Sequence, residues 1–444
     1  MQRFFTVVLL AIAVPASAQL LPGGGSGGLG GIGALPGQAL GGLSPLTGGT
    51  GGPLGNAPIS RLASEPLGIG GFLGDAIPDA RSLLQLRRER LRALVRDNGK
   101  ALAADPDGNP VRRDELLAID LSEADAAAIR AAGFTILRDD RVGGSRLTVL
   151  QPRKGLAIAK ALAALRLAAP GAAADYNHVF EPAGGPLQPN ATAPAPAESD
   201  SAGVTIGLVD GGVASHPALS GARIEQRGFA GAVQATGHGT AIASLLVGDA
   251  AGFRGAARGA RLLVADVYGG SAGNGSAESI ARGLDWLGSN GARVVNISLV
   301  GPPNLLVARS IAALQARGII IVAAVGNDGP AAPPLYPASY DRVIAVTAVD
   351  ARDKVLVEAG RARHVDFAAP GADMAAALQR SGYATVRGTS FAAPLVTARL
   401  AMSRGDALAA VTAEARPNRD ERMGRGIVCD SCRNDVKALS KKSR

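Results

Sequence analysis

The feature that most limits the fold of this 444-residue chain is a series of apolar strands that alternate with helices after residue 203. The expected strands cover residues 204–209, 261–267, 294–299, 319–325 and 343–349. The expected helices cover residues 240–247, 276–289, 304–317 and 391–404. Strands without a polar face are buried on both sides, and helical connections join parallel neighbours. The sequence therefore predicts an α/β fold with a doubly wound parallel sheet over residues 203–415, with its active site at the carboxyl ends of the strands.

A smaller α+β region is expected upstream, over residues 75–181. It begins with an amphipathic helix over residues 81–97, whose arginine-rich face we expect to be solvated. Strands and helices then follow in the order βαββαβ, over residues 115–121, 122–132, 134–139, 146–151, 156–168 and 176–180. This order is typical of a small split-βαβ domain. Residues 182–202 are rich in Pro, Ala and Gly and form the expected linker to the parallel-sheet domain.

The first 18 residues have the pattern of a secretory signal peptide. Arg3 precedes an apolar run over residues 4–14, and small residues lead to an expected cleavage site after Ala18. Residues 19–74 follow as an expected flexible segment, because 20 of the 60 glycines lie between residues 23 and 74. No other apolar run approaches the ~18 residues that a membrane span needs. We therefore expect an exported protein without a membrane span, located in the periplasm, at the cell surface or outside the cell.

Charge and cysteine content limit the possible partners. The net charge is +9, but the arginines are scattered and no basic stripe carries aromatic residues, which argues against nucleic-acid binding. Residues 416–444 are expected to form a tail with a single CxxC motif, Cys429 and Cys432. A lone CxxC cannot close a zinc site, and export favours a small disulfide loop over redox-active or free thiols. We expect a monomer without a resident cofactor.

Four polar residues follow strands or begin helices, each near a glycine. Asp210 ends the first strand, and His238 lies between two glycines directly before the helix at 240–247. Asn327 follows the strand at 319–325, and Ser390 begins the last helix. Each residue alone is also typical of a turn or a helix cap. Together they place a carboxylate, an imidazole, an amide and a hydroxyl at one edge of the sheet, where free N–H groups of a helix can stabilise a developing anion.

The segments around these residues resemble the signature blocks of the subtilisin family, in the family's order. They read Val-Asp-Gly-Gly-Val, His-Gly-Thr-Ala-Ile-Ala, Ala-Val-Gly-Asn-Asp-Gly and Gly-Thr-Ser-Phe-Ala-Ala-Pro. The resemblance covers residues 203–404 and implies a serine endopeptidase acting on proteins or peptides. It implies that Ser390 attacks the peptide carbonyl, that His238 transfers the proton and that Asp210 orients the imidazole. Asn327 and the Ser390 backbone N–H are then expected to hold the oxyanion.

The resemblance also assigns a substrate pocket and marks departures from the family. The expected pocket residues are Ser298, Leu299, Val300, Ala324, Val325 and Gly326, and one of the two segments is expected to pair with substrate as an extra strand. Val300 stands where the family often has Gly, which favours a smaller substrate side chain. Gly211 stands where the family usually has Ser or Thr, which removes a hydroxyl near Asp210. Calcium is left open, with Asp249 as the candidate ligand.

The upstream βαββαβ unit resembles the prodomain of such enzymes, which assists folding and inhibits the protease. Its last strand, 176–180, is expected near the active site, with cleavage within residues 181–201. An unrelated accessory domain is the alternative for this unit. For the whole chain, the alternative to a self-processing zymogen is a non-catalytic binding or assembly protein that keeps the subtilisin fold.

Overall fold

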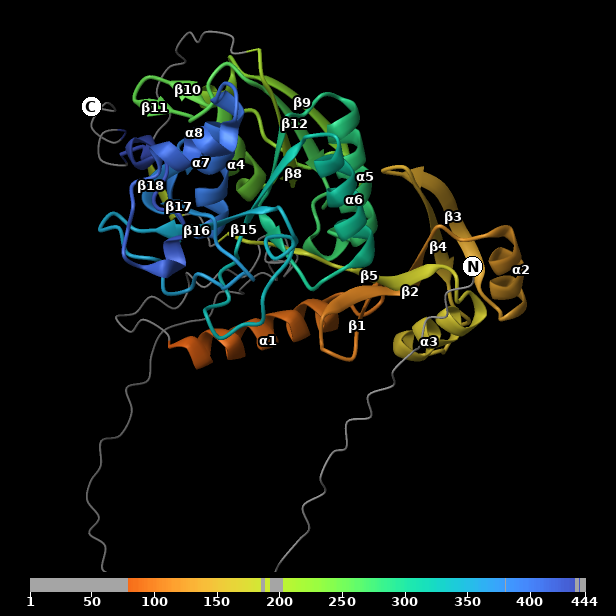
Figure 1. Ribbon diagram of the computed structural model, residues 1–444. Helices are drawn as coiled ribbons and strands as arrows, with labels where there is room; N and C mark the ends of the chain where they lie inside the picture. The colour runs from red at the N-terminus through yellow and green to blue at the C-terminus, as the bar shows by residue number, and fades with distance from the viewer. Residues whose placement is uncertain (1–78, 185–187, 192–202, 380, 436–438, 440–444) are drawn as a thin grey trace, which may run out of the picture. The chain divides into compact units, whose positions relative to one another are not determined.

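A computed structural model describes residues 79–184, 188–191, 203–379, 381–435 and 439 of the chain (Figure 1). The expected signal peptide and Gly-rich segment, residues 1–74, lie outside the described residues, as does most of the linker at 182–202. All described residues belong to one compact unit, which begins at residue 58. We call residues 79–184 the N-terminal subdomain and residues 203–435 the C-terminal subdomain. Within the described part of the chain, no helix is both long and apolar enough to cross a membrane.

Among the described residues, the C-terminal subdomain is built on a seven-stranded parallel sheet, which confirms the predicted fold class. The strand order is β17-β16-β15-β13-β8-β12-β9. The bounds are β8 (Thr205–Asp210), β9 (Arg223–Gly228), β12 (Arg261–Asp266), β13 (Val294–Ile297), β15 (Ile320–Ala324), β16 (Ile344–Val349) and β17 (Phe367–Pro370). The two edge strands, β9 and β17, were not expected from the sequence. The residues of β9 alternate between exposed and half-buried, so this strand lacks the continuous apolar pattern of the others.

Helices cover both faces of this sheet (Figure 1). On one face lie α5 (Ala277–Ser289) and α6 (Leu305–Ala316); on the other lie α4 (Gly237–Val247), α7 (Thr389–Met402) and α8 (Ala407–Glu414). Neighbouring residues of β8 serve both cores, because Leu208 packs with α4 and α7 while Val209 packs with α5. Every residue of α4 is buried. The site residues on α4 and α7 are therefore carried by elements that cannot shift without disturbing the core.

The N-terminal subdomain has the expected βαββαβ order after an additional short strand. Its elements are α1 (Ala80–Asp97), β1 (Leu102–Ala104), β2 (Pro110–Ile119), α2 (Glu123–Ala131), β3 (Thr135–Val142), β4 (Ser145–Gln151), α3 (Ile158–Ala168) and β5 (Ala173–His178). The strands form an antiparallel sheet in the order β1-β2-β4-β3, with β5 paired to β2. One face of this sheet packs on α2 and α3. The opposite face contributes Leu117, Leu147 and Val149 to the same apolar core as α5 and α6.

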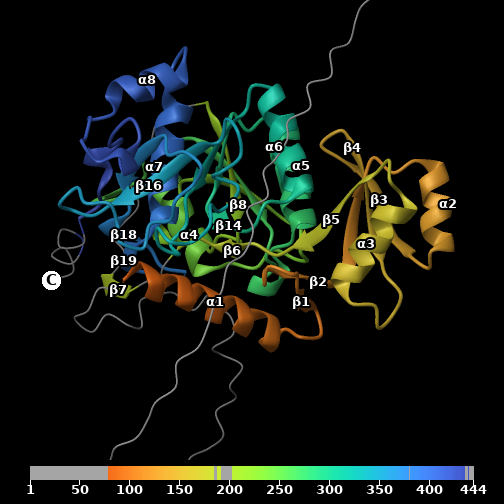
Figure 2. The same cartoon turned by 60° about the horizontal axis from the view of Figure 1, so that its bottom comes forward.

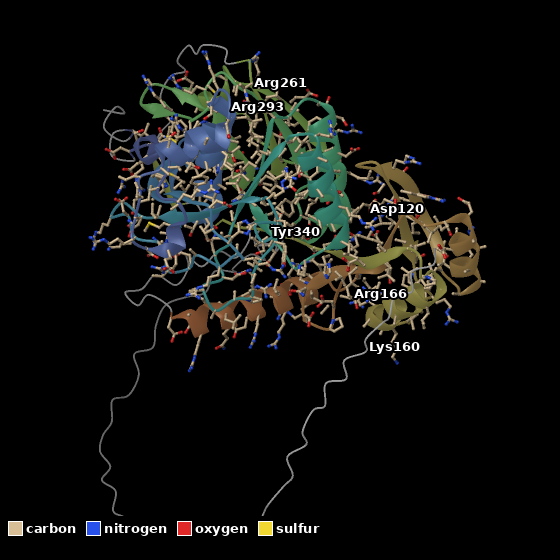
Figure 3. All side chains as sticks on the ribbon, viewed as in Figure 1. Asp120, Lys160, Arg166, Arg261, Arg293 and Tyr340 are labelled. Atoms are coloured by element: carbon tan, nitrogen blue, oxygen red, sulfur yellow. A yellow bond between two sulfur atoms is a disulfide. The ribbon has the colours of Figure 1, made fainter. Side chains whose placement is uncertain are left out.

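Polar contacts join the two subdomains around α6. Asn304 precedes this helix, and its Nδ2 donates to the Tyr176 carbonyl at 2.9 Å. The Tyr340 hydroxyl donates to the Asn304 carbonyl and accepts from the Asn304 N–H, each at 2.8 Å. Asp120, which follows β2, pairs with Arg309 on α6. Figure 3 shows Tyr340 on the C-terminal subdomain and Asp120 on the N-terminal one.

Residues 416–435 differ from the separate tail that the sequence suggested. Ile427 forms bridges with Ala368 and Arg416, and Val428 and Cys429 are buried in the core that contains α7. Ile427 and Val428 are adjacent apolar residues that lie beside β17, so residues 416–435 belong to the C-terminal subdomain. Cys429 and Cys432 are bonded to each other, which confirms the predicted disulfide loop.

Candidate active site

Asp210, His238 and Ser390 meet at the carboxyl edge of the sheet. Asp210 is the last residue of β8, His238 is the second residue of α4, and Ser390 is the second residue of α7. The His238 Nδ1 lies 2.9 Å from Asp210 Oδ2, and its Nε2 lies 3.0 Å from Ser390 Oγ. Their exposed fractions are 2%, 9% and 0%, respectively. The three side chains therefore form one buried hydrogen-bonded line in which Nδ1–H donates to the carboxylate and Nε2 accepts from the hydroxyl.

Local backbone geometry fixes this line. The Thr236 hydroxyl caps α4 by accepting from Gly239 N–H at 3.0 Å. A side chain on Gly239 would place its Cβ 2.3 Å from the Gly211 carbonyl oxygen, so only glycine allows α4 to start so close to the end of β8. Gly388, at the start of α7, has φ = 140°, a conformation that other residues rarely adopt. The glycines beside the site residues are thus required by close approach and by backbone conformation.

The departure at Gly211 has a structural explanation. A Cβ there would lie 2.4 Å from Thr236 Cγ2, so the Thr236 side chain fills the space that a larger residue would need. Asp210 still has a second donor, because Gly211 N–H donates to its Oδ1 at 2.7 Å. The carboxylate is therefore held by a backbone amide as well as by the imidazole.

The Asn327 side chain lies beside the start of α7, which carries Ser390. Its Oδ1 accepts from the Thr389 N–H at 2.9 Å, which fixes the orientation of the amide. The Nδ2 contacts the carbonyl oxygen of Ala183, a residue of the N-terminal subdomain. An amide donor held in this way can stabilise negative charge that develops on a carbonyl oxygen bound there.

The last residues of the N-terminal subdomain occupy the cleft beside the site. Strand β6 (Glu181–Pro182) pairs antiparallel with β14 (Leu299–Val300), and the two strands lie together in Figure 2. Ala183 N–H donates to the Ser298 carbonyl at 2.9 Å. A Cβ on Gly184 would lie 2.4 Å from His238 Nε2 and 2.8 Å from Ser390 Oγ. The peptide bond between Ala183 and Gly184 therefore lies between the Asn327 amide and the Ser390 hydroxyl.

The predicted pocket residues lie on two segments, of which the one at 298–300 contacts this peptide. Ser298, Leu299 and Val300 contact it through their backbone or lie in β14. Val300 and Ala324 belong to the same apolar cluster as Ala183, whereas Val325 belongs to the core of the opposite sheet face. Gly326 has φ = 94° and lies against Val300 and Leu335. Sequence reasoning missed Leu335, because it follows a loop with no strand pattern of its own.

The remaining histidines have partners outside this site. His216 Nδ1 accepts from Ala218 N–H at 3.0 Å, and its Nε2 lies 2.9 Å from the Gly382 carbonyl. Burial lowers the pKa of His216, which favours the neutral ring that these two contacts require. His178 lies between Asp105 and Asn304 at the junction of the subdomains. His238 is therefore the one histidine that contacts a serine hydroxyl among the described residues.

The candidate calcium ligand already has a cationic partner. Asp249 is buried, and its Oδ2 lies 3.3 Å from the guanidinium of Arg258. In the part of the chain that the structure describes, no group of three or more His, Cys, Asp or Glu side chains could hold a metal ion.

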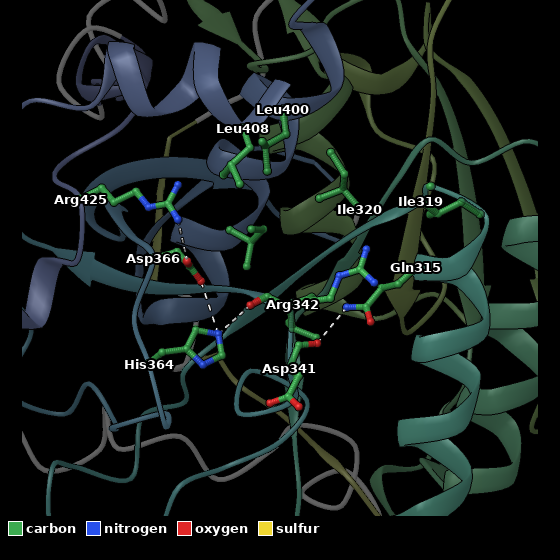
Figure 4. A pocket seen from close by; sticks show the side chains of 13 residues that line it. Gln315, Ile319, Ile320, Asp341, Arg342, His364, Asp366, Leu400, Leu408 and Arg425 are labelled. Atoms are coloured by element: carbon green, nitrogen blue, oxygen red, sulfur yellow. Dashed lines mark hydrogen bonds and ion pairs between the residues drawn. The ribbon is translucent and has the colours of Figure 1, made fainter. Parts of the chain in front are cut away.

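A second hollow of about 480 Å³ lies away from the cleft (Figure 4). It opens where β15 and β16 begin, at Ile320 and Ile344, whereas the site lies at the other ends of the strands. His364 lines it and contacts Asp366 and the Val343 carbonyl. None of the predicted site residues lies there.

A serine, a histidine and an aspartate in one hydrogen-bonded line, at the carboxyl edge of a doubly wound sheet, form an arrangement that serine hydrolases use. The sequence profile of the Subtilase family, Peptidase_S8, matches residues 201–418. Subtilisin Savinase from Lederbergia lenta is 35% identical over 205 residues, which cover 45% of this chain and 76% of Savinase. Thermitase from Thermoactinomyces vulgaris is 32% identical over 239 residues, covering 51% of this chain and 85% of thermitase. The chain therefore belongs to the subtilase family and is a subtilisin-like serine endopeptidase.

Two further comparisons add to these. The alkaline protease of Alkalihalobacillus alcalophilus is 35% identical over 205 residues, but the match covers only 53% of that protein. Fervidolysin from Fervidobacterium pennivorans, described as a keratinolytic enzyme related to subtilisin, has a similar fold with a TM-score of 0.61 at 18% identity. That likeness covers 76% of this chain and 62% of fervidolysin. Because residues 203–444 make up little more than half of the chain, the fold likeness includes residues before 203.

Proposed function

We propose that Ser390, His238 and Asp210 hydrolyse peptide bonds as a catalytic triad, with Asn327 as an oxyanion donor. One observation carries this proposal: the continuous hydrogen bonds from Asp210 through His238 to Ser390. His238 takes the proton of Ser390 Oγ as this oxygen attacks the carbonyl carbon, and Asp210 stabilises the imidazolium. The Asn327 amide stabilises the oxyanion. His238 then gives the proton to the leaving amine. Water next attacks the acyl carbon while His238 takes its proton, and the ester bond breaks as His238 returns that proton to Ser390 Oγ.

We propose further that the chain is a zymogen that cleaves itself between Ala183 and Gly184. The Ala183 carbonyl contacts the Asn327 amide, and Gly184 lies against His238 and Ser390. The backbone pairing of β6 with β14 is the arrangement of a peptide that adds a strand to the cleft. After cleavage, residues up to Ala183 form the N-terminal product, which occupies the cleft as an inhibitor until it is released.

The substrates are proteins or peptides with a small side chain before the scissile bond. The support is Ala183 itself, a small residue that is 3% exposed and precedes the residue lying against His238 and Ser390. Val300 pairs with Glu181 next to this place, and a side chain larger than Gly there leaves room only for a smaller substrate side chain. Residues 1–18 direct export of the zymogen, so the enzyme acts outside the cytoplasm.

The test compares the full-length wild type with Ser390→Ala and with a control, Ser220→Ala, which alters an exposed serine. We expect the wild type and the control to produce a fragment that begins at Gly184, and Ser390→Ala to stay uncleaved. Amino-terminal sequencing of the fragment and labelling with a serine-directed fluorophosphonate are the measurements. Equal processing in the wild type and Ser390→Ala contradicts the mechanism. Absence of both labelling and cleavage in all three favours the non-catalytic binding protein.

A further inference from the structure

Helix α1 crosses the cleft that holds residues 181–184. Figure 2 shows α1 running beneath β6 and β14. Its buried apolar residues are Leu83 and Leu91. Leu83 contacts the backbone of the loop after Asn327, because a side chain on Gly329 would collide with it. Leu91 shares a small hollow with Val300 of the cleft wall. The helix thus covers the side of the cleft that binds residues before the scissile bond.

Two arginines of α1 contact the residue next to Asn327. Arg87 Nε lies 3.0 Å from Asp328 Oδ2, and Arg90 Nη2 lies 2.8 Å from Asp328 Oδ1. The Asp328 side chain is 5% exposed, so both of its oxygens are shielded from water and paired with α1. Arg90 Nε also lies 3.1 Å from Glu181 Oε1. The Arg90 guanidinium therefore contacts both the peptide in the cleft, through Glu181, and the wall of the cleft, through Asp328.

These contacts differ from the solvated arginine face that the sequence suggested. Arg87 and Arg90 are three residues apart and project from the same side of α1, which also carries the buried leucines. Arg88, which points away from that side, is exposed. Burial alone would lower the pKa of Arg90, but the carboxylates of Glu181 and Asp328 outweigh it and raise the pKa above its usual value. The charge on Arg90 therefore persists although the group is partly desolvated.

Cleavage between Ala183 and Gly184 leaves all of these contacts in place. Glu181 and α1 belong to the N-terminal product, whereas Asp328 belongs to the C-terminal product. A break in the chain removes the covalent link but no ion pair. We propose that α1 is a latch that retains the N-terminal product in the cleft after self-cleavage, with the surface around Asp328 as its docking site. This inference rests on the proposed self-processing and adds the element that sets the rate of product release.

The latch is tested with the full-length chain carrying a C-terminal affinity tag. After self-cleavage, the C-terminal product is immobilised, washed for increasing times, and assayed for the N-terminal product that remains and for peptidase activity. We expect Arg90→Gln to release the N-terminal product roughly tenfold to a hundredfold faster than the wild type, because charged hydrogen bonds at a shielded site are lost. Activity should rise at the same rate. Arg88→Gln is the matched control and should release the product at the wild-type rate.

Asp328→Asn provides a second, independent variant. If the latch acts through the pair of Arg90 and Asp328, the effect of Arg90→Gln on release should be smaller in the Asp328→Asn background than in the wild type. Cleavage at Ala183 in each variant reports that the chain has folded. Equal release from the wild type and Arg90→Gln, or equal acceleration by Arg88→Gln, overturns the latch while leaving self-processing intact. Failure of the wild type to cleave overturns the proposed function instead.

Discussion

The N-terminal subdomain contacts the C-terminal subdomain through two regions of different character. We call the surface of β2, β3 and β4 that faces α5 and α6 the docking face, and we call α1 with residues 179–184 the cleft arm. The docking face has an apolar centre, with Leu117 and Leu147 fully buried in the core that includes α5 and α6. The cleft arm is held by backbone pairing with β14 and by the ion pairs of Asp328. Burial of apolar area supplies affinity, whereas the directional contacts of the arm align one peptide bond with the site.

The two regions therefore have different expected effects: the docking face contributes binding energy, whereas the cleft arm positions one peptide bond and, as the proposed latch, slows release of the N-terminal product. The docking face includes neither Ala183 nor Gly184, so the proposed cleavage would leave its contacts unchanged. The cleft arm places Ala183 against Asn327 and Gly184 against Ser390. Substitutions in the docking face should therefore change the free energy of unfolding. Substitutions in the cleft arm, or in the residues that contact it, should change the rates of cleavage and of product release.

The largest expected effect is on stability, at the centre of the docking face. Leu147→Ala removes a side chain with 0% exposure and should lower the free energy of unfolding of the N-terminal subdomain by about 2–5 kcal/mol. The measurement is urea denaturation in the uncleaved Ser390→Ala background, with amide exchange in β2 and β4 as the local readout. Leu137→Ala on β3 is the control, since Leu137 is 39% exposed and should cost little. Equal effects of the two substitutions would show that the docking face is not a packed interface.

The second effect concerns Asn327, which contacts the cleft arm. Asn327→Ala removes the amide that contacts the Ala183 carbonyl and should lower kcat by about 10²–10³, a range known from another subtilase that loses its oxyanion asparagine. KM should change much less, because the amide acts on charge that develops in the transition state. Steady-state kinetics on a peptide substrate provide the measurement. Asn418→Ala, at an exposed position, is the control. A rate for Asn327→Ala close to that of the control contradicts the oxyanion role.

The fold of the C-terminal subdomain was largely predictable, because its central strands are buried on both faces and their sequences are apolar throughout. The edge strands were not, since β9 is half-exposed and has no such pattern, and β17 is a buried strand of only 4 residues. The attachment of residues 416–435 was also missed. Ile427 and Val428 form too short an apolar run to predict a strand, and their burial depends on a partner, β17, that is distant in the sequence.

The meeting of Asp210, His238 and Ser390 at one edge of the sheet was predictable, because each ends a buried strand or begins a helix and lies near a glycine. The exact bond in the cleft was not predictable, since its position depends on the pairing of β6 with β14, more than a hundred residues apart. The contact between Arg90 and Asp328 was not predictable for the same reason. Several arginines lie on α1, and only the fold shows which of them faces Asp328.

The third effect lies at the rim of the docking face. Glu278 on α5 accepts from Arg138 of β3 at 2.7 Å and from Arg282 at 3.1 Å, and its side chain is 10% exposed. Glu278→Gln keeps the shape but removes the charge, and it should weaken the docked state by about 1.5–3 kcal/mol, the range for hydrogen bonds to charged groups. The same urea series in the Ser390→Ala background measures the change. Self-cleavage of the corresponding active chain should proceed at the wild-type rate, and a large fall in that rate would contradict the assignment of peptide positioning to the cleft arm.

The smallest effect is expected where the docking face meets solvent. Arg309 on α6 pairs with Asp120, and the two side chains are 45% and 55% exposed. An exposed pair contributes only about 0–1 kcal/mol, because water screens the charges and both side chains lose conformational freedom. Arg309→Gln should therefore shift the unfolding free energy far less than Glu278→Gln, and the shift should vanish in roughly 1 M salt, where the Debye length falls to about 3 Å. Urea denaturation at low and high salt measures both effects. A salt-independent loss of unfolding free energy as large as that of Glu278→Gln would mean that burial does not determine how much each contact of the docking face contributes to stability.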